Sequence, residues 1–141
     1  MVPPDRTPST DEDDEQDLTE EELEYFRGKL QDEKSRLQER IERHTEALLT
    51  SETGLTEEVD LANRQAERAT QMKLVDKERR LLAQIQRALG KFAEGDYGIC
   101  EGTGDMIARK RLELRPWTRY SVHYKEMLER QKKQVAKVIP E

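Results

Sequence analysis

The chain has 141 residues, of which 40% are charged and 33% are hydrophobic, and its formal net charge is −6. This composition is too polar for a thick globular core but suits helices with narrow apolar stripes, arranged as one domain with or without a tail. No apolar run is long enough for a membrane span, we recognise no secretory signal, and the single cysteine, Cys100, fits a reducing cytoplasm.

Residues 1–17 contain three prolines, no aromatic residue and the acidic run DEDDE at residues 11–15. Such a segment buries too little apolar surface to offset the entropy lost on ordering, so we expect a disordered acidic arm. Two interpretations are open. The arm is a solubilising leader, or it is an electrostatic mimic or self-masking tail.

The first helix is predicted to begin after Thr19. This residue can act as the N-cap, and Glu22, three residues later, completes a capping box. Apolar residues then recur at helical spacing, which indicates a seam against one partner helix. They are Leu23, Phe26, Leu30, Leu37, Ile41 and Leu48. His44 falls at the edge of this stripe without a metal-ligand partner at suitable spacing, so we interpret it as a seam residue.

The second helix is predicted from about residue 57 to residue 93. Small residues near its start, Ala62, Ala66 and Ala69, are expected to allow close helix approach. Larger ones follow, namely Met72, Val75, Leu82, Ile85, Leu89 and Phe92. The solvent side is expected to carry cations among Asp76 and Glu78. These cations form a solvated face, or they grip an acidic rim on a partner.

Between the two helices, Ser51-Glu52-Thr53-Gly54 provides the break. Two long helices joined by a short loop with a glycine fold back as an antiparallel hairpin. We therefore predict a mainly all-α protein with a long coiled-coil hairpin at residues 18–95. Its tip lies near residues 51–62 and carries the carboxylates of Glu57, Glu58 and Asp60.

The chain changes character after residue 95. Three glycines between residues 98 and 104 predict an irregular turn, and residues 96–120 are expected to form a small lobe. Pro116 breaks a helix, and a final helix is predicted from about residue 120 to residue 138, within a C-terminal part at residues 121–141. From residue 105 to residue 137 there are ten Lys or Arg against four Asp or Glu. A compact anionic partner or an acidic protein surface fits this lobe better than extended DNA.

Several motifs together resemble one family. The run DYGICE at residues 96–101, the run IARKRLELRP at residues 107–116 and Lys125 are similar to the C-terminal domain of the DksA/TraR family. Residues 18–44 look like the first coiled-coil helix of that family, and VDLA at residues 59–62 looks like its tip motif. The resemblance covers nearly all of residues 18–131.

This resemblance implies a regulator that inserts its coiled coil into the secondary channel of bacterial RNA polymerase. Family members destabilise open promoter complexes, usually with the alarmone ppGpp in the stringent response. The family's tip pattern Asp-x-x-Asp-x-Ala falls on Glu57, Asp60 and Ala62, so the first acid is lengthened by one methylene. The ppGpp contacts of relatives fall on Gln84, Arg115 and Lys125. A neutral amide at position 84 predicts a weakened or lost response to ppGpp.

The resemblance also implies a zinc site with four cysteines in two Cys-x-x-Cys pairs. The matching positions here hold Cys100, Thr103, Ser121 and Tyr124. Neutral hydroxyls are poor substitutes for thiolates, and His123 beside Tyr124 would supply only a second ligand. We therefore expect no zinc, with the lobe held by packing of apolar and aromatic side chains. These are Ile99, Ile107, Leu112, Trp117, Tyr120 and Tyr124.

Two alternatives remain beside the polymerase-bound regulator. A transcript-cleavage or elongation factor of the Gre type uses an acidic coiled-coil tip in the same channel, where the carboxylates hold Mg²⁺. A coiled-coil scaffold would instead form a stable homodimer. No nucleophile–base pair or glycine-rich phosphate loop indicates a free-standing enzyme. We expect a cytoplasmic monomer that binds RNA polymerase, without membrane association or sequence-specific DNA binding.

Overall fold

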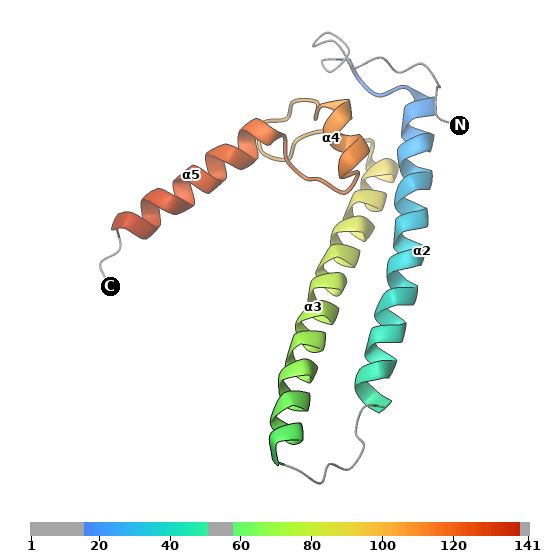
Figure 1. Cartoon of the computed structure of the whole chain (residues 1–141). Helices are drawn as coiled ribbons and strands as arrows, with labels where there is room; N and C mark the ends of the chain where they lie inside the picture. Colours follow the sequence, from blue (N-terminus) through green and yellow to red (C-terminus); the bar gives the residue numbers. More distant parts are fainter. Residues whose placement is uncertain (1–15, 51–57, 139–141) are drawn as a thin grey trace. The chain divides into compact units, whose positions relative to one another are not determined.

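The computed structural model describes residues 16–50 and 58–138, and within these ranges it consists of four α-helices without a strand (Figure 1). They are α2 (Glu20–Thr50), α3 (Glu58–Glu94), α4 (Arg109–Leu114) and α5 (Val122–Val138). The mainly all-α class is confirmed. None of the helices in the described ranges has the length and apolar character that crossing a membrane requires.

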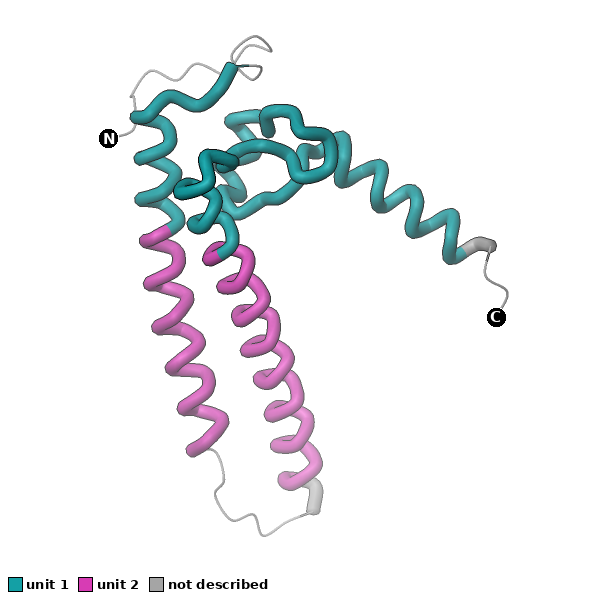
Figure 2. Tube along the Cα trace, turned by 180° about the vertical axis from the view of Figure 1, so that it is seen from behind, with its two compact units in different colours: residues 1–30, 87–141 teal, residues 31–86 magenta. Residues whose placement is uncertain are grey.

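The chain divides into two compact units, which Figure 2 shows in different colours. Unit 1 comprises residues 1–30 and 87–141, and unit 2 comprises residues 31–86. Unit 2 contains the later two thirds of α2 and the larger, earlier part of α3. Unit 1 contains the start of α2, the end of α3 and all that follows.

In unit 2, α2 and α3 run antiparallel. His44 on α2 pairs with Glu78 on α3, with 2.6 Å between Nδ1 and Oε1, and Arg68 on α3 donates to the carbonyl oxygen of Leu48 at 3.1 Å. Of the two α2 residues, Leu48 comes later in the chain, and its partner Arg68 comes earlier in α3 than Glu78, as antiparallel helices require. Leu37, Val75 and Ile85 are buried in the apolar part of this unit. This arrangement confirms the predicted hairpin of two long helices.

The seam of α3 differs from the one that the sequence predicted. Ala62, Ala66, Ala69 and Met72 are all exposed, so they do not bring the helices close together. A step of nine residues turns a helix by about 900° in total, which puts Ala66 on the side opposite Val75. Arg68 lies one heptad before Val75, closer to the predicted tip, and is half-buried. The seam therefore continues through Arg68.

Glu78 is the second correction in this unit. The sequence placed it among the solvent-facing charges, but it is 7% exposed and lies three residues after Val75 on the buried face. His44 stands opposite and is half-buried, as its seam assignment predicted. A carboxylate can occupy this interior position because the imidazole provides a hydrogen-bonding partner.

Unit 1 is built on the start of α2. The predicted capping box is present: the Thr19 N–H donates to Glu22 Oε1 at 3.1 Å, and the Glu22 N–H donates to Thr19 Oγ1 at 3.2 Å. Phe26 and Leu30 are fully buried one and two turns later. The ring of Tyr97 lies 5.9 Å from that of Phe26 and stacks on Phe92 at 4.1 Å. These rings join the start of α2 to the end of α3 within the unit.

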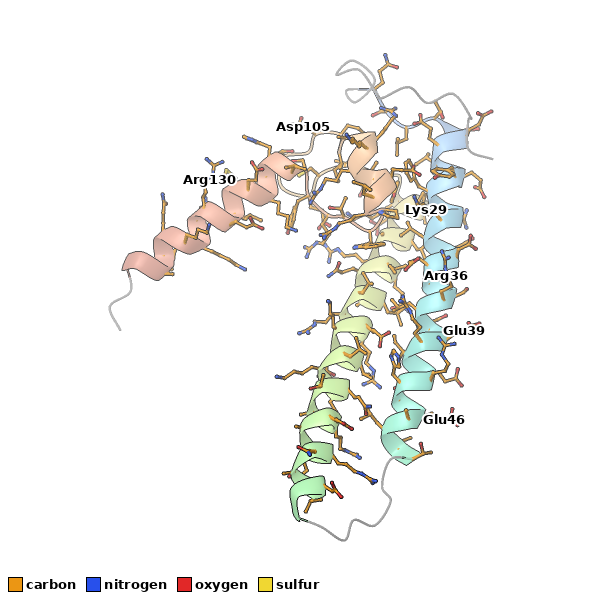
Figure 3. All side chains as sticks on the ribbon, in the orientation of Figure 1. Lys29, Arg36, Glu39, Glu46, Asp105 and Arg130 are labelled. Carbon is orange, nitrogen blue, oxygen red and sulfur yellow. The ribbon has the colours of Figure 1, made fainter. Side chains whose placement is uncertain are left out.

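Polar contacts fix α4 against α2. The guanidinium of Arg109 binds Glu22 at 2.6 Å, and both side chains are buried. At the other end of α4, Lys29 of α2 (labelled in Figure 3) donates to the carbonyl oxygen of Glu113 at 2.6 Å and pairs with its carboxylate at 3.0 Å. The hydroxyl of Tyr25 also donates to that carboxylate. Glu22 therefore both caps α2 and anchors α4.

Candidate functional site

Two of the three predicted tip residues belong to the start of α3. Asp60 and Ala62 are exposed in its first turns, whereas Glu57 lies outside the described residues. Among the described residues, no hydrogen bond or ion pair engages the carboxylate of Asp60. Within unit 2, α3 thus presents an acidic side chain whose charge is not neutralised by the fold.

The three residues that match the family's ppGpp contacts fall in different units. Gln84 is exposed on the part of α3 that belongs to unit 2. Arg115 is exposed directly after α4, and Lys125 is half-buried in the first turns of α5, both in unit 1. The chain thus offers two cations and one neutral amide at these positions.

A turn in unit 1 positions the sulfur of Cys100. The Gly104 N–H donates to the Cys100 carbonyl oxygen at 2.9 Å, the Cys100 N–H donates to Asp105 at 2.8 Å, and Ile99 forms an antiparallel bridge with Met106. Gly98 and Gly104 have φ values of +85° and +78°, which favour glycine in this turn. Cys100 is 1% exposed.

Hydrogen-bond donors surround that sulfur. The Ser121 N–H donates to Sγ at 3.3 Å. Burial by itself raises the pKa of the Cys100 thiol. Donors on Thr103, on the Ser121 backbone and on the backbone of Thr103 and Gly102 together outweigh burial, and they lower this pKa to about 7. These donors therefore favour the thiolate form of Cys100 more than the surroundings of an ordinary buried thiol would.

The other three positions that the resemblance matched to zinc ligands make contacts of other kinds. Thr103 Oγ1 accepts the Asp105 N–H at 3.2 Å. Ser121 Oγ accepts the Tyr124 N–H at 3.3 Å, so Ser121 caps α5, which begins at Val122 rather than at residue 120 as predicted. The ring of Tyr124 packs against Gly102. One thiol, two aliphatic hydroxyls and a packed phenol do not fit a four-thiolate zinc site.

The described residues contain no cluster of three or more His, Cys, Asp or Glu side chains arranged to hold a metal ion. His123, which the sequence offered as a second ligand, is exposed on α5. Much of the predicted packing around the lobe is observed. Ile107 and Leu112 are fully buried, and Ile99, Trp117, Tyr120 and Tyr124 are half-buried.

Glu101, next to Cys100, forms ion pairs with three cations, a cluster that the sequence analysis missed. Its carboxylate pairs with Arg87 at 2.5 Å, Lys91 at 2.8 Å and Arg119 at 3.1 Å. Burial alone raises the pKa of Glu101, but the hydrogen bonds from Arg119, Lys91 and Arg87 outweigh it and lower the pKa to about 2. Spacing along the chain could have suggested only that Arg87 and Lys91 share one side of a helix.

Tyr97 is a second residue whose role exceeds the prediction. Its hydroxyl donates to the carbonyl oxygen of Pro116 at 2.8 Å. Burial first, and then the charge of Glu113, raise the pKa of Tyr97 well above its usual range. The phenol thus stays neutral and holds the loop after α4 to the end of α3.

Two family models match the chain. The DnaK suppressor protein DksA N-terminal domain matches residues 22–92, and the prokaryotic dksA/traR C4-type zinc finger matches residues 95–123. The first match covers both helices of the hairpin. The second covers the turn around Cys100, which is the single cysteine of this chain although the matched family is of the C4 type.

Similar proteins agree with these matches. The RNA polymerase-binding transcription factor DksA of Caulobacter vibrioides is 37% identical, over 85% of this chain and 84% of that protein. The protein of the same name from Escherichia coli K12 is 29% identical, over 86% of this chain and 81% of that protein.

A solved structure of transcription factor DksA2 from Pseudomonas aeruginosa is also similar. It superposes with a TM-score of 0.74 at 37% identity, over 81% of this chain and 88% of that one. An RNA polymerase binding protein and transcriptional regulator from Chlamydia trachomatis gives a TM-score of 0.51 at 29% identity, over 82% of this chain and 95% of that one. The helix pair, the glycine-rich turn and these likenesses lead to one conclusion: the chain belongs to the DksA family.

Proposed function

We propose that this protein regulates transcription by binding bacterial RNA polymerase and inserting its coiled coil into the secondary channel. Family membership carries the proposal, since the similar proteins are RNA polymerase-binding transcription factors by name. The exposed carboxylate of Asp60 on a helix pair is the structural feature that supports it. The protein has no catalytic reaction of its own in this proposal.

The tip acts electrostatically. The end of the helix pair is proposed to approach the polymerase active centre, where Asp60 and Glu57 would bring negative charge close to nucleic acid and bound cations. Ala62, which is exposed two residues after Asp60, adds neither charge nor bulk to its side of α3. The expected result is a shorter lifetime of open promoter complexes at ribosomal promoters and altered initiation at amino-acid promoters.

The effector ppGpp is proposed to bind between this protein and polymerase. Arg115 and Lys125 would contact its phosphates because both are cations at the matching positions. Gln84 would contribute only a neutral contact, which lacks the extra strength of a charge-assisted hydrogen bond. Dependence on ppGpp is therefore proposed to be weak.

The lobe is proposed to fold and act without zinc. Donors on Ser121, Thr103 and Gly102 stabilise the Cys100 thiolate in place of a metal, and aromatic packing holds the surrounding chain. The protein would thus serve as a zinc-independent, monomeric regulator in the cytoplasm, without sequence-specific DNA binding.

In vitro transcription tests the function. Purified protein added to bacterial RNA polymerase on a ribosomal promoter should shorten open-complex lifetime, with and without ppGpp. Asp60→Asn should bind polymerase normally and lose most of this effect, since an exposed residue without partners contributes little to folding. Asp76→Asn, another exposed aspartate on α3, is the matched control and should act like wild type.

Two results would contradict the proposal. Equal activity of Asp60→Asn and wild type would show that the tip assignment is wrong. Stimulated cleavage of the transcript in stalled elongation complexes would identify a factor of the Gre type instead.

A further inference from the structure

Three cations of unit 1 share a single carboxylate. Arg87 and Lys91 at the end of α3, and Arg119 in the loop before α5, form ion pairs with Glu101 at 2.5, 2.8 and 3.1 Å. Among the described residues, no other carboxylate pairs with any of the three cations. Arginine and lysine are charged at neutral pH, so three cations and one carboxylate leave a net charge of +2. We call these four residues the Glu101 cluster.

The fold of unit 1 holds the Glu101 cluster together. Arg87 and Lys91 are four residues apart and therefore lie on one side of α3. The backbone N–H of Glu101 donates to the carbonyl oxygen of Arg119 at 2.9 Å, and the guanidinium of Arg119 lies over the ring of Tyr120, 5.1 Å from its centroid. These contacts position the cations in advance, so a ligand that binds them would cost less side-chain entropy.

The two arginines of the cluster are open to solvent. The side chain of Arg87 is 53% exposed and that of Arg119 is 40% exposed, whereas that of Lys91 is only 13% exposed. Arg87 donates to Glu101 through Nη2, and Arg119 donates through Nε and Nη2. The other N–H groups of the two guanidiniums have no hydrogen-bond acceptor among the described residues. Both arginines thus keep donors for a second anion.

A doubly charged phosphate group matches the charge of this cluster. A phosphate monoester carries about −1.5 to −2 charges at pH 7 and three acceptor oxygens, which would neutralise the net charge of +2. Arginine binds such oxygens through pairs of parallel N–H donors. Each phosphodiester of a nucleic acid carries one negative charge, as does each carboxylate of a protein, so either would leave the cluster positive. The charge balance therefore favours a terminal phosphate over a nucleic acid or an acidic protein.

We propose that Arg87 and Arg119 form a binding site for the terminal phosphate of a small phosphorylated compound, with Glu101 holding the two guanidiniums in place. The cluster contains none of the three positions that the resemblance matched to ppGpp contacts. The inference goes beyond the proposed function, because the site lies within unit 1 of the free protein and does not require polymerase.

An NMR titration of the full-length free protein with methyl phosphate tests the site. At about pH 7.5 this monoester is mostly a dianion, and the Nε–H signals of Arg87 and Arg119 should shift and saturate. Dimethyl phosphate has the same phosphorus centre but one charge, so it should bind at least about tenfold more weakly. Equal affinities for the two probes would mean that only general attraction of anions acts, and would overturn the proposal. The absence of a saturable shift would overturn it as well.

A matched pair of variants separates the site from net charge. R87Q/R119Q should lose saturable binding of methyl phosphate. K132Q/K133Q removes the same charge from two exposed cations of α5, and its affinity should change less than about twofold. An equal loss in both variants would show that net charge alone attracts the phosphate, contrary to the proposal.

The single variant R87Q keeps the test decisive if the double variant does not fold. Glu101 then retains Lys91 and Arg119, so circular dichroism should show a folded protein. The affinity of R87Q for methyl phosphate should fall roughly two- to fivefold, as the loss of one exposed charge contact predicts. An unchanged affinity, or shifts confined to the positions matched to ppGpp contacts, would show that the phosphate binds elsewhere.

Discussion

The ring of Tyr124 lies directly over the bare Cα of Gly102. A Cβ built on Gly102 would come within 2.2 Å of two carbon atoms of that ring, a distance at which the ring must move. Gly102 lies between two positions that the resemblance matched to zinc ligands, Cys100 and Thr103, and Tyr124 occupies a third. Packing of a phenol on a glycine thus joins the turn at Cys100 to α5.

Gly102→Ala should therefore destabilise the protein. Overpacking of this kind costs about 1–3 kcal/mol, because the Tyr124 ring has to leave its position. Thermal and urea unfolding measure the change. Gly28→Ala is the control, since nothing lies within 4 Å of its added Cβ, and it should stabilise α2 by about 0.5–1 kcal/mol. If Gly102→Ala is as stable as wild type, the Tyr124 contact is not part of the fold in solution.

The pair formed by His44 and Glu78 should be energetically coupled. A double-mutant cycle with His44→Ala and Glu78→Ala should give a coupling free energy of about 1 kcal/mol, because Glu78 is buried. The exposed pair of Glu33 and Arg36 on α2 provides the comparison and should give about 0.3 kcal/mol. Additive effects of the two alanine substitutions would contradict the observed contact.

The carboxylate of Glu101 should make the free energy of unfolding depend on pH in the acidic range. Its pKa is lowered from 4.5 to about 2 by its three cations, so the folded state favours the carboxylate. The stabilisation is complete above about pH 4.5 and is lost as pH falls toward 2. Glu101→Gln should cost about 1–2 kcal/mol at pH 7, a figure that allows for the solvent exposure of Arg87 and Arg119.

Urea unfolding at several pH values measures this effect. The difference between wild type and Glu101→Gln should shrink between pH 5 and pH 2. Glu129→Gln, on an exposed position of α5, should stay within about 0.5 kcal/mol of wild type throughout. A constant difference across this range would show that charge at Glu101 is not the cause.

Purified protein should contain far less than one zinc per chain. Chelator should leave its melting temperature unchanged, and Cys100→Ser should be mild, because donors rather than a metal satisfy the sulfur. The variant T103C/S121C/Y124C restores four thiols and should acquire zinc, with a melting temperature that chelator lowers. Stoichiometric zinc in wild type, lost together with helical signal on chelation, would refute this expectation.

Gln84→Lys should increase the response of transcription to ppGpp. A new cation facing the phosphates contributes about 1.5–3 kcal/mol, which lowers the effective ppGpp concentration roughly ten- to hundredfold. Gln86→Lys, two residues later and exposed on another side of α3, is the control and should leave the response unchanged. Equal responses of the two variants would mean that the effector does not contact position 84.

Sequence patterns predicted the elements well because local rules determine them. The cap at Thr19, the buried stripe through Phe26 and Leu37, and the end of α3 before Gly95 all follow from helix propensity and spacing. Through a resemblance, the sequence also matched Cys100 and Ser121 to one site, and the Ser121 N–H does donate to Cys100 Sγ. The position of Glu57 in space lies outside the described residues, so the tip remains partly a prediction.

Contacts between distant residues were not predictable. Arg109 could have paired with any exposed acid, and only the packing of α4 on α2 selects Glu22. Likewise, Arg119 reaches Glu101 because the loop after Pro116 returns toward the turn. The predicted apolar seam of α3 was wrong near the tip. Alanine favours helix formation equally well on a buried or an exposed face, so the spacing of the alanines indicated a stripe that the fold does not bury.

The buried pair in unit 2 has a consequence for how α2 and α3 align along their length. Glu78 contacts two residues of α2, His44 at 2.6 Å and Arg40, one turn earlier, at 4.0 Å. If α3 slid past α2 by one turn in the direction away from Arg40, this buried carboxylate would lose both partners, at a cost of several kcal/mol. Apolar seam residues such as Leu37 and Val75 would tolerate that slip far better, because aliphatic side chains pack with many neighbours. The polar contacts of Glu78 therefore favour one register of the two helices, and the position of Asp60 along the helix pair follows from it.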